Sequence, residues 1–430
     1  MAVPGAGTID RAGDRIAERL GDERALGIFR RAMTETLDRA VETLADGTTF
    51  VITGDIPAMW LRDSSAQLRP YLYLAGDPEL AALIAGAVER QCEYIVLDPY
   101  ANAFNRAPDG AGHSGDRTDM NPWVWERKYE VDSLCHPVQL AYLLWRVTGS
   151  AAHLGERFRA AAEAILRVLR TEQDHENRSP YRFERDDCPA SDTLVRDGLG
   201  PVTAVTGMTW SAFRPSDDAC RHGFNVPGNL FAATALGHLE EIAHEVFDDG
   251  DLAARAARLR AEISAGVAAH GVVDHPRFGR IYAYEVDGLG DANLMDDANV
   301  PSLLSLPMLG AVDAGDPVYA ATRRFVLSDA NPHFHAGTAA AGIGSPHTPD
   351  GHVWPIALAV EGLTAEDAAE RARLIATLRD TDAGTGRMHE SFHRDRPETY
   401  TREWFSWADA MYCELLLRHS GLRLDAEARR

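Results

Sequence analysis

The feature that most limits how this 430-residue chain can fold is an amphipathic pattern with a period of 3.6 residues, which recurs along most of its length. In the segment 151–174, apolar side chains follow one helix face at Leu154, Phe158, Ala161, Ala162, Ile165 and Leu169. Valine and isoleucine runs typical of parallel strands are scarce. The pattern predicts about twelve helices, at residues 25–45, 64–76, 79–97, 131–148, 151–174, 226–245, 250–269, 299–309, 316–328, 351–362, 364–380 and 400–420.

Long connections rich in Trp, His, Asp, Asn, Gly and Pro separate these helices, near residues 98–130, 176–223, 271–298, 329–350 and 381–399. Long loops in compact domains are usually functional or disordered, and these carry too many aromatic residues for disorder. Six helix pairs with such loops predict an all-α fold, an (α/α)6 barrel of six inner and six outer helices with long active-site loops. Closure of the barrel is inferred, because periodicity alone does not establish it.

Composition narrows the class of protein further. With 43 Lys+Arg against 65 Asp+Glu, the net charge of −22 argues against a nucleic-acid partner. The sequence has no apolar run long enough to span a membrane and no apolar signal core within 1–24, so we predict a cytoplasmic protein without membrane attachment. The five scattered cysteines predict reduced, buried thiols.

No Pro/Ser/Gly-rich linker or charge block divides the sequence. We therefore expect a single catalytic domain over residues 1–430, with a short N-terminal extension at about 1–24.

Two loops that run into helices have a composition typical of sugar binding. They contain Trp60, Arg62 and Asp63 in one case, and Trp125 and Glu126 in the other. Aromatic ring faces contact the C–H side of a pyranose, while carboxylates and guanidinium groups pair with its hydroxyls. Structural alternatives stay open: Asp63 could cap a helix that begins at Ser64, and acidic residues after Trp125 could interact with a helix dipole.

Two further loops carry carboxylates suited to acid and base roles. In Arg214-Pro215-Ser216-Asp217-Asp218, repulsion and burial can keep one carboxyl protonated while the arginine holds the other ionised. A protonated carboxyl is what a leaving oxygen needs. Glu390 lies among histidines and small residues, where a base could hold a water, and Trp404 follows. The alternatives are a helix cap for the aspartate pair and a surface ion pair of Glu390 with Arg387 or Arg394.

Two histidine clusters, at 331–335 and 345–352, raise the question of a metal site. Neither forms a His-Glu-x-x-His helix and no thiolates accompany them, so we expect sugar contacts, His347 included, and no bound metal or other cofactor. The segment Asp296-Asp297-Ala298-Asn299 is similar to the acidic motif of terpene cyclases. It lacks that motif's further acidic position, and no second magnesium-ligand motif follows.

Together these motifs resemble the exo-acting α-1,6-mannosidases of glycoside hydrolase family 125. The similarity extends from about residue 31 to residue 417, through the segments 59–64, 213–219, 297–304, 344–348 and 388–392. Five segments in the same order are a far more specific signal than any one of them. The resemblance implies an (α/α)6 barrel that removes non-reducing-end mannose from mannose-containing oligosaccharides, inverts the anomeric carbon and needs no metal.

The resemblance also implies roles for individual residues. The general acid falls within 214–218, with Asp217 favoured over Asp218 because it occupies the family's first aspartate position, and the general base is Glu390. Inversion requires the two carboxyl groups to be about 6.5–9.5 Å apart. The residues we expect to bind the terminal sugar are Trp60, Arg62, Asp63, Trp125, Glu126, Arg214, Asp218, Asn299, His347 and Trp404.

Two other functions compete with this interpretation. One is a different (α/α)6 glycosidase, of the trehalase or glucoamylase kind, which would release glucose. The other is a non-catalytic sugar-binding protein, against which the presence of both candidate carboxylates argues. No motif specifies the natural glycan, the strictness of linkage preference or the oligomeric state.

Overall fold

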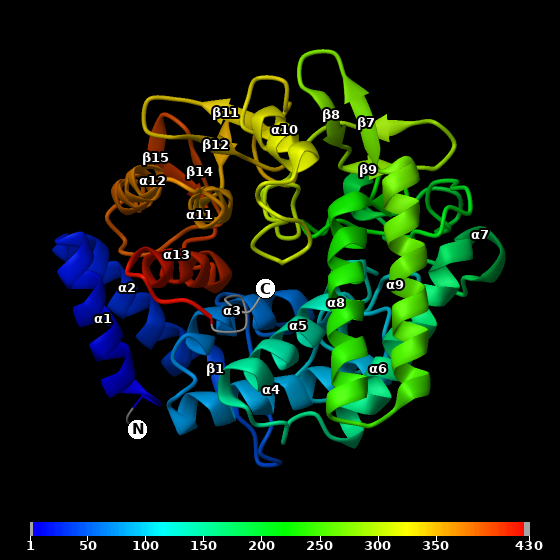
Figure 1. The fold of residues 1–430 in the computed structure, drawn as a ribbon, viewed down its shortest axis with the longest axis horizontal. Coiled ribbons are helices and arrows are strands. Elements are labelled where there is room, and N and C mark those ends of the chain that lie inside the picture. Colours follow the sequence, from blue (N-terminus) through cyan, green and yellow to red (C-terminus); the bar gives the residue numbers. More distant parts are fainter. Residues whose placement is uncertain (1–2, 425–430) are drawn as a thin grey trace. The chain divides into compact units, whose positions relative to one another are not determined.

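The computed structural model describes residues 3–424, and helices dominate it (Figure 1). The α-helices of the described residues are α1 (Ala6–Leu20), α2 (Glu23–Glu35), α3 (Leu61–Leu72), α4 (Pro78–Leu97), α5 (Val131–Thr148), α6 (Glu156–Thr171), α7 (His175–Arg178), α8 (Val226–Glu245), α9 (Gly250–His270), α10 (Pro317–Val326), α11 (Pro355–Leu363), α12 (Ala368–Asp380) and α13 (Ser406–His419). Most of the helices expected from periodicity are therefore present.

The connections between the helices contain short strands, and the sequence pattern did not predict these strands. They are β1 (Val41–Thr43), β2 (Thr49–Val51), β3 (Met59–Trp60), β4 (Ala103–Phe104), β5 (Val124–Glu126), β6 (Phe224–Asn225), β7 (Val272–His275), β8 (Gly279–Tyr282), β9 (Glu285–Val286), β10 (Ala292–Asn293), β11 (Phe334–Ala336), β12 (Ala341–Ile343), β13 (His352–Val353), β14 (Ser391–His393) and β15 (Arg396–Thr401). Most are two or three residues long, too short for a periodicity of two to stand out in the sequence.

Polar caps explain why several helices begin where they do. The Asp22 carboxylate accepts the backbone N–H groups of Arg24 and Ala25 at the start of α2. Asn225 caps α8 and Asp249 caps α9 in the same way, through Gly228 and Leu252. Each cap satisfies backbone donors that have no partner inside the helix, which fixes the helix start.

Three expectations about helices are wrong. The segment 25–45 ends as a helix at Glu35, where a π turn (Thr36–Ala40) and β1 follow. The segment 299–309 forms turns, because Pro301 and Pro307 interrupt it and the Asp296 carboxylate takes the N–H groups of Leu303 and Leu304. The segment 400–420 is helical only from Ser406, since β15 extends to Thr401.

Contacts divide the described residues into two compact units. The first contains the chain up to Arg90, Leu140–His153 and the chain from His333 onwards, and the second contains Gln91–Gln139 and Leu154–Pro332. A single catalytic domain with an extension at about 1–24 stays a prediction. Within the first unit, α1 packs on α2 and α13.

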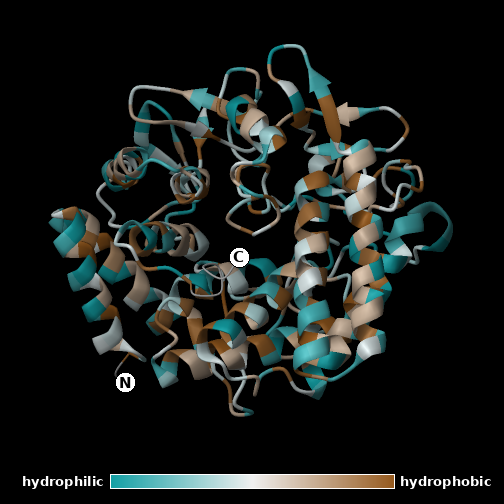
Figure 2. Ribbon diagram, viewed as in Figure 1, coloured by the Kyte–Doolittle hydropathy of each residue, from teal (hydrophilic) through white to brown (hydrophobic). Residues whose placement is uncertain are grey.

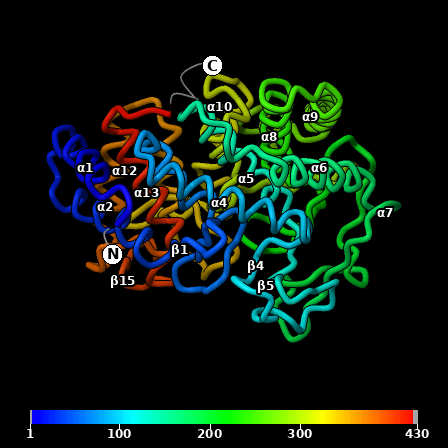
Figure 3. Tube along the Cα trace, turned by 90° about the horizontal axis from the view of Figure 1, so that it is seen from below, coloured from blue at the N-terminus to red at the C-terminus, as the bar shows by residue number. Residues whose placement is uncertain are grey.

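In the first unit, α13 is the central helix. Its residues from Ser406 to Leu417 are buried, and it packs against α2, α3, α11 and α12 (Figure 1). In the second unit, α8 and α9 run side by side and α6 packs on α9 (Figures 1 and 3). Both apolar and polar residues occur along α6 (Figure 2), and its buried residues, among them Phe158, Ile165 and Leu169, lie on one face, as expected of an amphipathic helix.

Among residues 3–424, no helix combines the length and apolar character needed to cross a membrane. The five cysteines are free thiols. Four are buried as expected, whereas Cys188 is half-buried.

Candidate active site

The loop that carries the two adjacent aspartates is a tight turn in the second unit. A bridge pairs Phe213 with Ala219, and the N–H of Arg214 donates to the carbonyl of Asp218 at 2.8 Å. The N–H of Asp217 donates back to the carbonyl of Arg214 at 2.9 Å, and Asp217 has a φ of 67°. The left-handed region is uncommon for a non-glycine residue, although aspartate adopts it more readily than most, and here it places Asp217 at the tip of the turn.

Polar side chains surround Asp217. The Asn102 amide nitrogen lies 3.5 Å from Oδ1 of Asp217 and 3.1 Å from Oε2 of Glu126. The ammonium group of Lys128 donates to the backbone carbonyl of Asp217 at 2.8 Å. Asp217 is half-buried, whereas Asp218 is buried, which favours Asp217 as the carboxyl that meets a ligand.

The side chain of Arg214, a residue of this turn, forms a buried ion pair. Its Nε is 2.5 Å from Oε1 of Glu285, while Oε2 of Glu285 accepts the N–H groups of Arg221 and His222. Glu285 raises the pKa of Arg214 despite its burial. Arg214 is thus anchored by Glu285, so its expected contact with sugar stays a prediction.

The segment that contains Asn299 is tied to the same turn. Ser216 donates to Oδ2 of Asp297 at 2.9 Å, and the Asn299 side-chain amide donates to Oδ1 of Asp297 at 3.1 Å. Two motifs about 80 residues apart in sequence therefore meet through one buried carboxylate. The carboxylate of Asp297 therefore accepts hydrogen bonds from the side chains of Ser216 and Asn299.

Trp125 and Glu126 lie on β5, which pairs with β4. Trp125 is half-exposed and can offer a ring to a ligand. Glu126 is buried, and its Oε1 accepts Arg185 at 2.8 Å while Oε2 accepts Asn102. Both oxygens of Glu126 have protein partners, and its expected contact with sugar stays a prediction.

The loop that carries Glu390 is built within the first unit, and Glu390 directly precedes β14. Its side chain is largely buried, and Nη1 of Arg402 lies 3.5 Å from its Oε1. Asp55 orients Arg402 through an ion pair, with Nε 2.9 Å from Oδ2. Just upstream, the N–H of Met388 donates to Oδ1 of Asp409 at 2.8 Å.

His389 supports the same loop. Its Nδ1 bonds the carbonyl of Glu403 at 2.9 Å, and its ring stacks on Tyr400 with a centroid separation of 3.7 Å. Burial lowers the pKa of His389, so the neutral ring is the form that packs here.

Trp60, Arg62 and Asp63 also lie in the first unit and are buried. Helix α3 begins at Leu61, so the alternative in which Asp63 caps a helix beginning at Ser64 is wrong. Asp63 instead lies in the first turn of α3, with Oδ2 3.6 Å from Nε of Arg62.

Trp404 and His347 lie in different surroundings, and their expected contacts with sugar stay predictions. Arg39 covers one face of the Trp404 ring at 4.3 Å from its centroid, and the ring packs against Gly54, whose φ is 121°. A Cβ at Gly54 would lie 2.9 Å from the Trp404 carbonyl, so glycine is required there. His347 is exposed on the connection between β12 and β13.

The histidine clusters form part of the small sheet β13-β14-β15 and its neighbours. His352 pairs in register with His393, their ring centroids are 5.9 Å apart, and Nδ1 of His352 bonds the hydroxyl of Ser391. Within the described part of the chain, no group of three or more His, Cys, Asp or Glu side chains is arranged to hold a metal ion.

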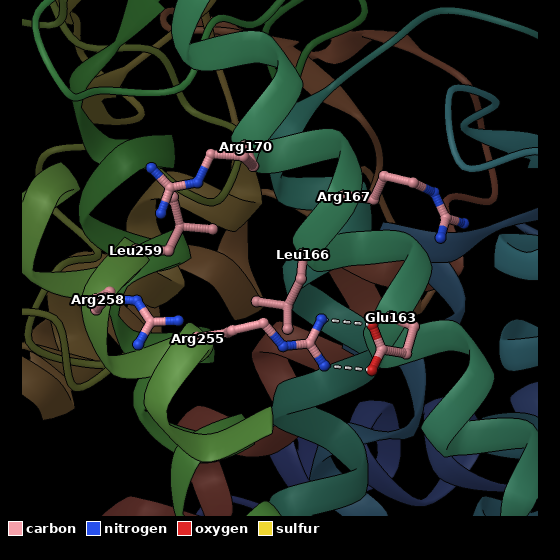
Figure 4. Close-up of a pocket in the computed structure, with 7 residues that line it drawn as sticks. All are labelled: Glu163, Leu166, Arg167, Arg170, Arg255, Arg258 and Leu259. Atoms are coloured by element: carbon pink, nitrogen blue, oxygen red, sulfur yellow. Dashed lines mark hydrogen bonds and ion pairs between the residues drawn. The ribbon is translucent and has the colours of Figure 1, made fainter. Parts of the chain in front are cut away.

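A cavity of about 380 Å³ opens between α6 and α9 (Figure 4). It is lined by Glu163, Leu166, Arg167, Arg170, Arg255, Arg258 and Leu259. Arg255 is paired with Glu163, and Arg167 projects to the other side of α6 from Arg170 and Arg258 (Figure 4). The cavity has no aromatic ring and none of the candidate residues, so it lacks the features of a sugar site.

Sequence reasoning missed four residues that hold the candidate carboxylates: Asn102, Lys128, Arg402 and Asp409. Lys128 lies close in sequence to Trp125 and Glu126, and Arg402 lies close to Trp404, which were expected to bind sugar. If every charged residue of those segments had been considered, Lys128 and Arg402 would have been found. No sequence pattern around Asn102 or Asp409 indicates their roles, because only the fold brings them to the loops that they support.

Comparisons with known proteins agree with these motifs. Residues 22–417 match the family described as metal-independent alpha-mannosidase, glycoside hydrolase family 125. The Meiotically up-regulated gene 157 protein of Schizosaccharomyces pombe is 40% identical over 433 residues, covering 95% of this chain and 85% of the relative.

Two solved structures show the fold. A metal-independent α-mannosidase of Streptococcus pneumoniae, in a non-productive complex with α-1,6-mannobiose, is 52% identical with a TM-score of 0.96, covering 98% of this chain and 100% of the other. A bacterial glucoamylase complexed with acarbose is 12% identical with a TM-score of 0.62, covering 92% of this chain and 56% of the other. The predicted (α/α)6 fold is thereby confirmed. The chain belongs to glycoside hydrolase family 125, the metal-independent α-mannosidases.

Proposed function

We propose that this protein is an exo-acting α-mannosidase that releases α-1,6-linked mannose from the non-reducing end of oligosaccharides with inversion of configuration. The observation that carries the proposal is the 52% identity, over 98% of the chain, to a metal-independent α-mannosidase whose structure contains α-1,6-mannobiose. The candidate carboxylates, each in a loop held by buried polar contacts, support it.

The proposed reaction is a single displacement. Protonated Asp217 donates its proton to the glycosidic oxygen as the bond to C1 breaks. Ionised Glu390 removes a proton from a water that attacks C1 from the opposite face, through an oxocarbenium-like transition state. The product is β-mannose and a shortened oligosaccharide.

We propose that the terminal mannose contacts the sugar-binding residues that the sequence predicts, which are Trp60, Arg62, Asp63, Trp125, Arg214, Asp218, Asn299, His347 and Trp404. Glu126, whose oxygens are occupied by Asn102 and Arg185, contributes by holding the surroundings of Asp217 in place.

The test is incubation of purified protein with α-1,6-, α-1,3- and α-1,2-linked mannobiose, with product anomers followed by proton NMR at early times. We expect β-mannose from the 1,6-linked sugar. Release of α-mannose would overturn inversion, and hydrolysis of only the other linkages would overturn the linkage assignment. Absence of hydrolysis of all three would contradict the activity itself.

Variants test the two roles. Glu390→Gln should reduce kcat by about 100-fold to 10,000-fold, the usual size of a general base contribution. Binding of the mannobiose should stay measurable by calorimetry, because the amide keeps the shape of the side chain. Unchanged turnover would remove Glu390 from its role. Turnover of Asp217→Asn and Asp218→Asn is compared under the same conditions. The variant with the larger loss of turnover identifies the proton donor.

We also propose a cytoplasmic location, which five free thiols support because reduced cysteines persist there. The substrate would then be imported oligosaccharide or a turnover fragment. Cell fractionation tests this, and a secreted or periplasmic pool would contradict it.

A further inference from the structure

The left-handed backbone of Asp217 has a contact beyond the hydrogen bonds of its own turn. Its φ of 67° lies in the left-handed region, where a β-carbon is disfavoured. This conformation sets the direction in which the carboxyl leaves the chain. A turn that relaxed to an ordinary conformation would therefore displace the carboxyl.

Lys128 supplies that contact. Its side chain is 2% exposed, and its ammonium group donates to the carbonyl of Asp217 at 2.8 Å and to Oδ1 of Asp192 at 2.7 Å. Oε1 of Glu126 lies 3.8 Å away, and the Phe213 ring packs at 5.1 Å. A buried ammonium ion is costly unless such partners surround it.

A second route joins the same residue to the carboxyl of Asp217. The backbone N–H of Lys128 donates to Oδ1 of Asn102 at 3.1 Å. The amide nitrogen of Asn102 lies 3.5 Å from Oδ1 of Asp217. The side chain of Lys128 thus holds the main chain of Asp217, while its backbone orients the amide that faces the carboxyl.

We propose that Lys128 is a positioning residue for the general acid: it holds Asp217 in its left-handed conformation so that the carboxyl faces the leaving oxygen. This inference rests on the proposed role of Asp217. Lys128 itself touches neither substrate nor the reacting atoms. A compact charge with three donors suits this position, because the ammonium group donates to one carbonyl and one carboxylate and lies 3.8 Å from a second carboxylate.

The test uses the dependence of rate on the leaving group. Lys128→Met keeps the length of the side chain but removes its donors, and should lower kcat on α-1,6-mannobiose about 100-fold, the usual effect of a displacement near 1 Å. The sugar leaving group of mannobiose needs a proton, whereas 2,4-dinitrophenolate departs without one. On 2,4-dinitrophenyl α-mannoside we therefore expect less than about threefold loss, with KM for mannobiose nearly unchanged.

Two comparisons separate this role from a general loss of structure. Asp192→Asn removes the negative charge of one partner of the ammonium group but leaves the bond of the ammonium group to Asp217, so it should keep activity within a few fold on both substrates. Lys128→Arg retains the charge but not the compact geometry, and should show a weaker form of the same selectivity. Thermal unfolding of each variant reports whether it folds.

The outcomes distinguish the inference from the proposed function. If Asp217→Asn loses activity equally on both substrates, the assignment of Asp217 as acid fails. If Asp217→Asn is selective but Lys128→Met loses activity equally on both, or keeps wild-type rates on mannobiose, the positioning role of Lys128 is overturned. If Lys128→Met does not fold, equal loss on both substrates by Lys128→Arg overturns it instead.

Discussion

The backbone N–H of Met388 donates to Oδ1 of Asp409 at 2.8 Å, which ties the loop of Glu390 to the buried helix α13. Burial raises the pKa of Asp409 to about 7, and the nearby Glu35 carboxylate adds to this. The Met388 N–H, Arg387 and Arg31 oppose the rise. The support beneath the candidate base thus contains a carboxyl that titrates near neutral pH.

This carboxyl predicts a pH-dependent stability. Between its ordinary pKa of 3.8 and about 7, folded Asp409 binds more protons than unfolded Asp409, so its contribution to the free energy of unfolding falls as pH rises through that window. Asp409→Asn keeps an oxygen for the Met388 N–H but cannot ionise. Its melting temperature should therefore rise relative to wild type between pH 5 and pH 8, on the order of several degrees.

Calorimetric melting at intervals across that range checks the prediction. Asp10→Asn, at an exposed position of α1, is the matched control and should follow the wild-type curve. Parallel curves for Asp409→Asn and wild type would show that Asp409 is not the group responsible.

Replacing Arg402 should affect activity differently from replacing Lys128. Because Arg402 approaches Glu390 and is oriented by Asp55, Arg402→Met should displace the base and lower kcat about tenfold to 100-fold. A base is needed whatever the leaving group, so the loss should be similar on mannobiose and on 2,4-dinitrophenyl α-mannoside. Steady-state kinetics with both substrates measures it, with Arg394→Met on the adjoining β14–β15 turn as control. Loss confined to mannobiose would exclude this role.

The Arg214–Glu285 pair predicts a large stability effect. Glu285 is fully buried, and replacing it with glutamine leaves the buried guanidinium without its counter-charge, which should cost about 3–5 kcal/mol of unfolding free energy. Urea unfolding measures the change. Asp329→Asn, which breaks the exposed pair with Arg277, should have little effect. Comparable small changes in both variants would contradict the importance of the buried pair.

Removal of metal ions should leave the activity intact, as membership of a metal-independent family implies. Protein dialysed against EDTA and assayed on α-1,6-mannobiose should retain the kcat of untreated protein. A loss that added zinc or calcium restores would mean that the histidine and aspartate clusters had been wrongly interpreted.

The sequence by itself determined the positions of most helices and of the motifs. Apolar spacing is local, so α6, α8 and α9 were found within a few residues of their ends. The helix expected at 299–309 failed because Asp296 and two prolines override a local apolar pattern. Five short motifs in a fixed order, two of which contain Asp217 and Glu390, identified the family.

The tertiary structure decided which protein groups contact those side chains. Arg214 and Glu126 have the composition of sugar ligands, yet Glu285, Arg185 and Asn102 bind them. The contacts that support Asp217 come from residues 89 and 115 positions away in sequence. Such pairings depend on how distant segments pack, a property that no local pattern of residues encodes.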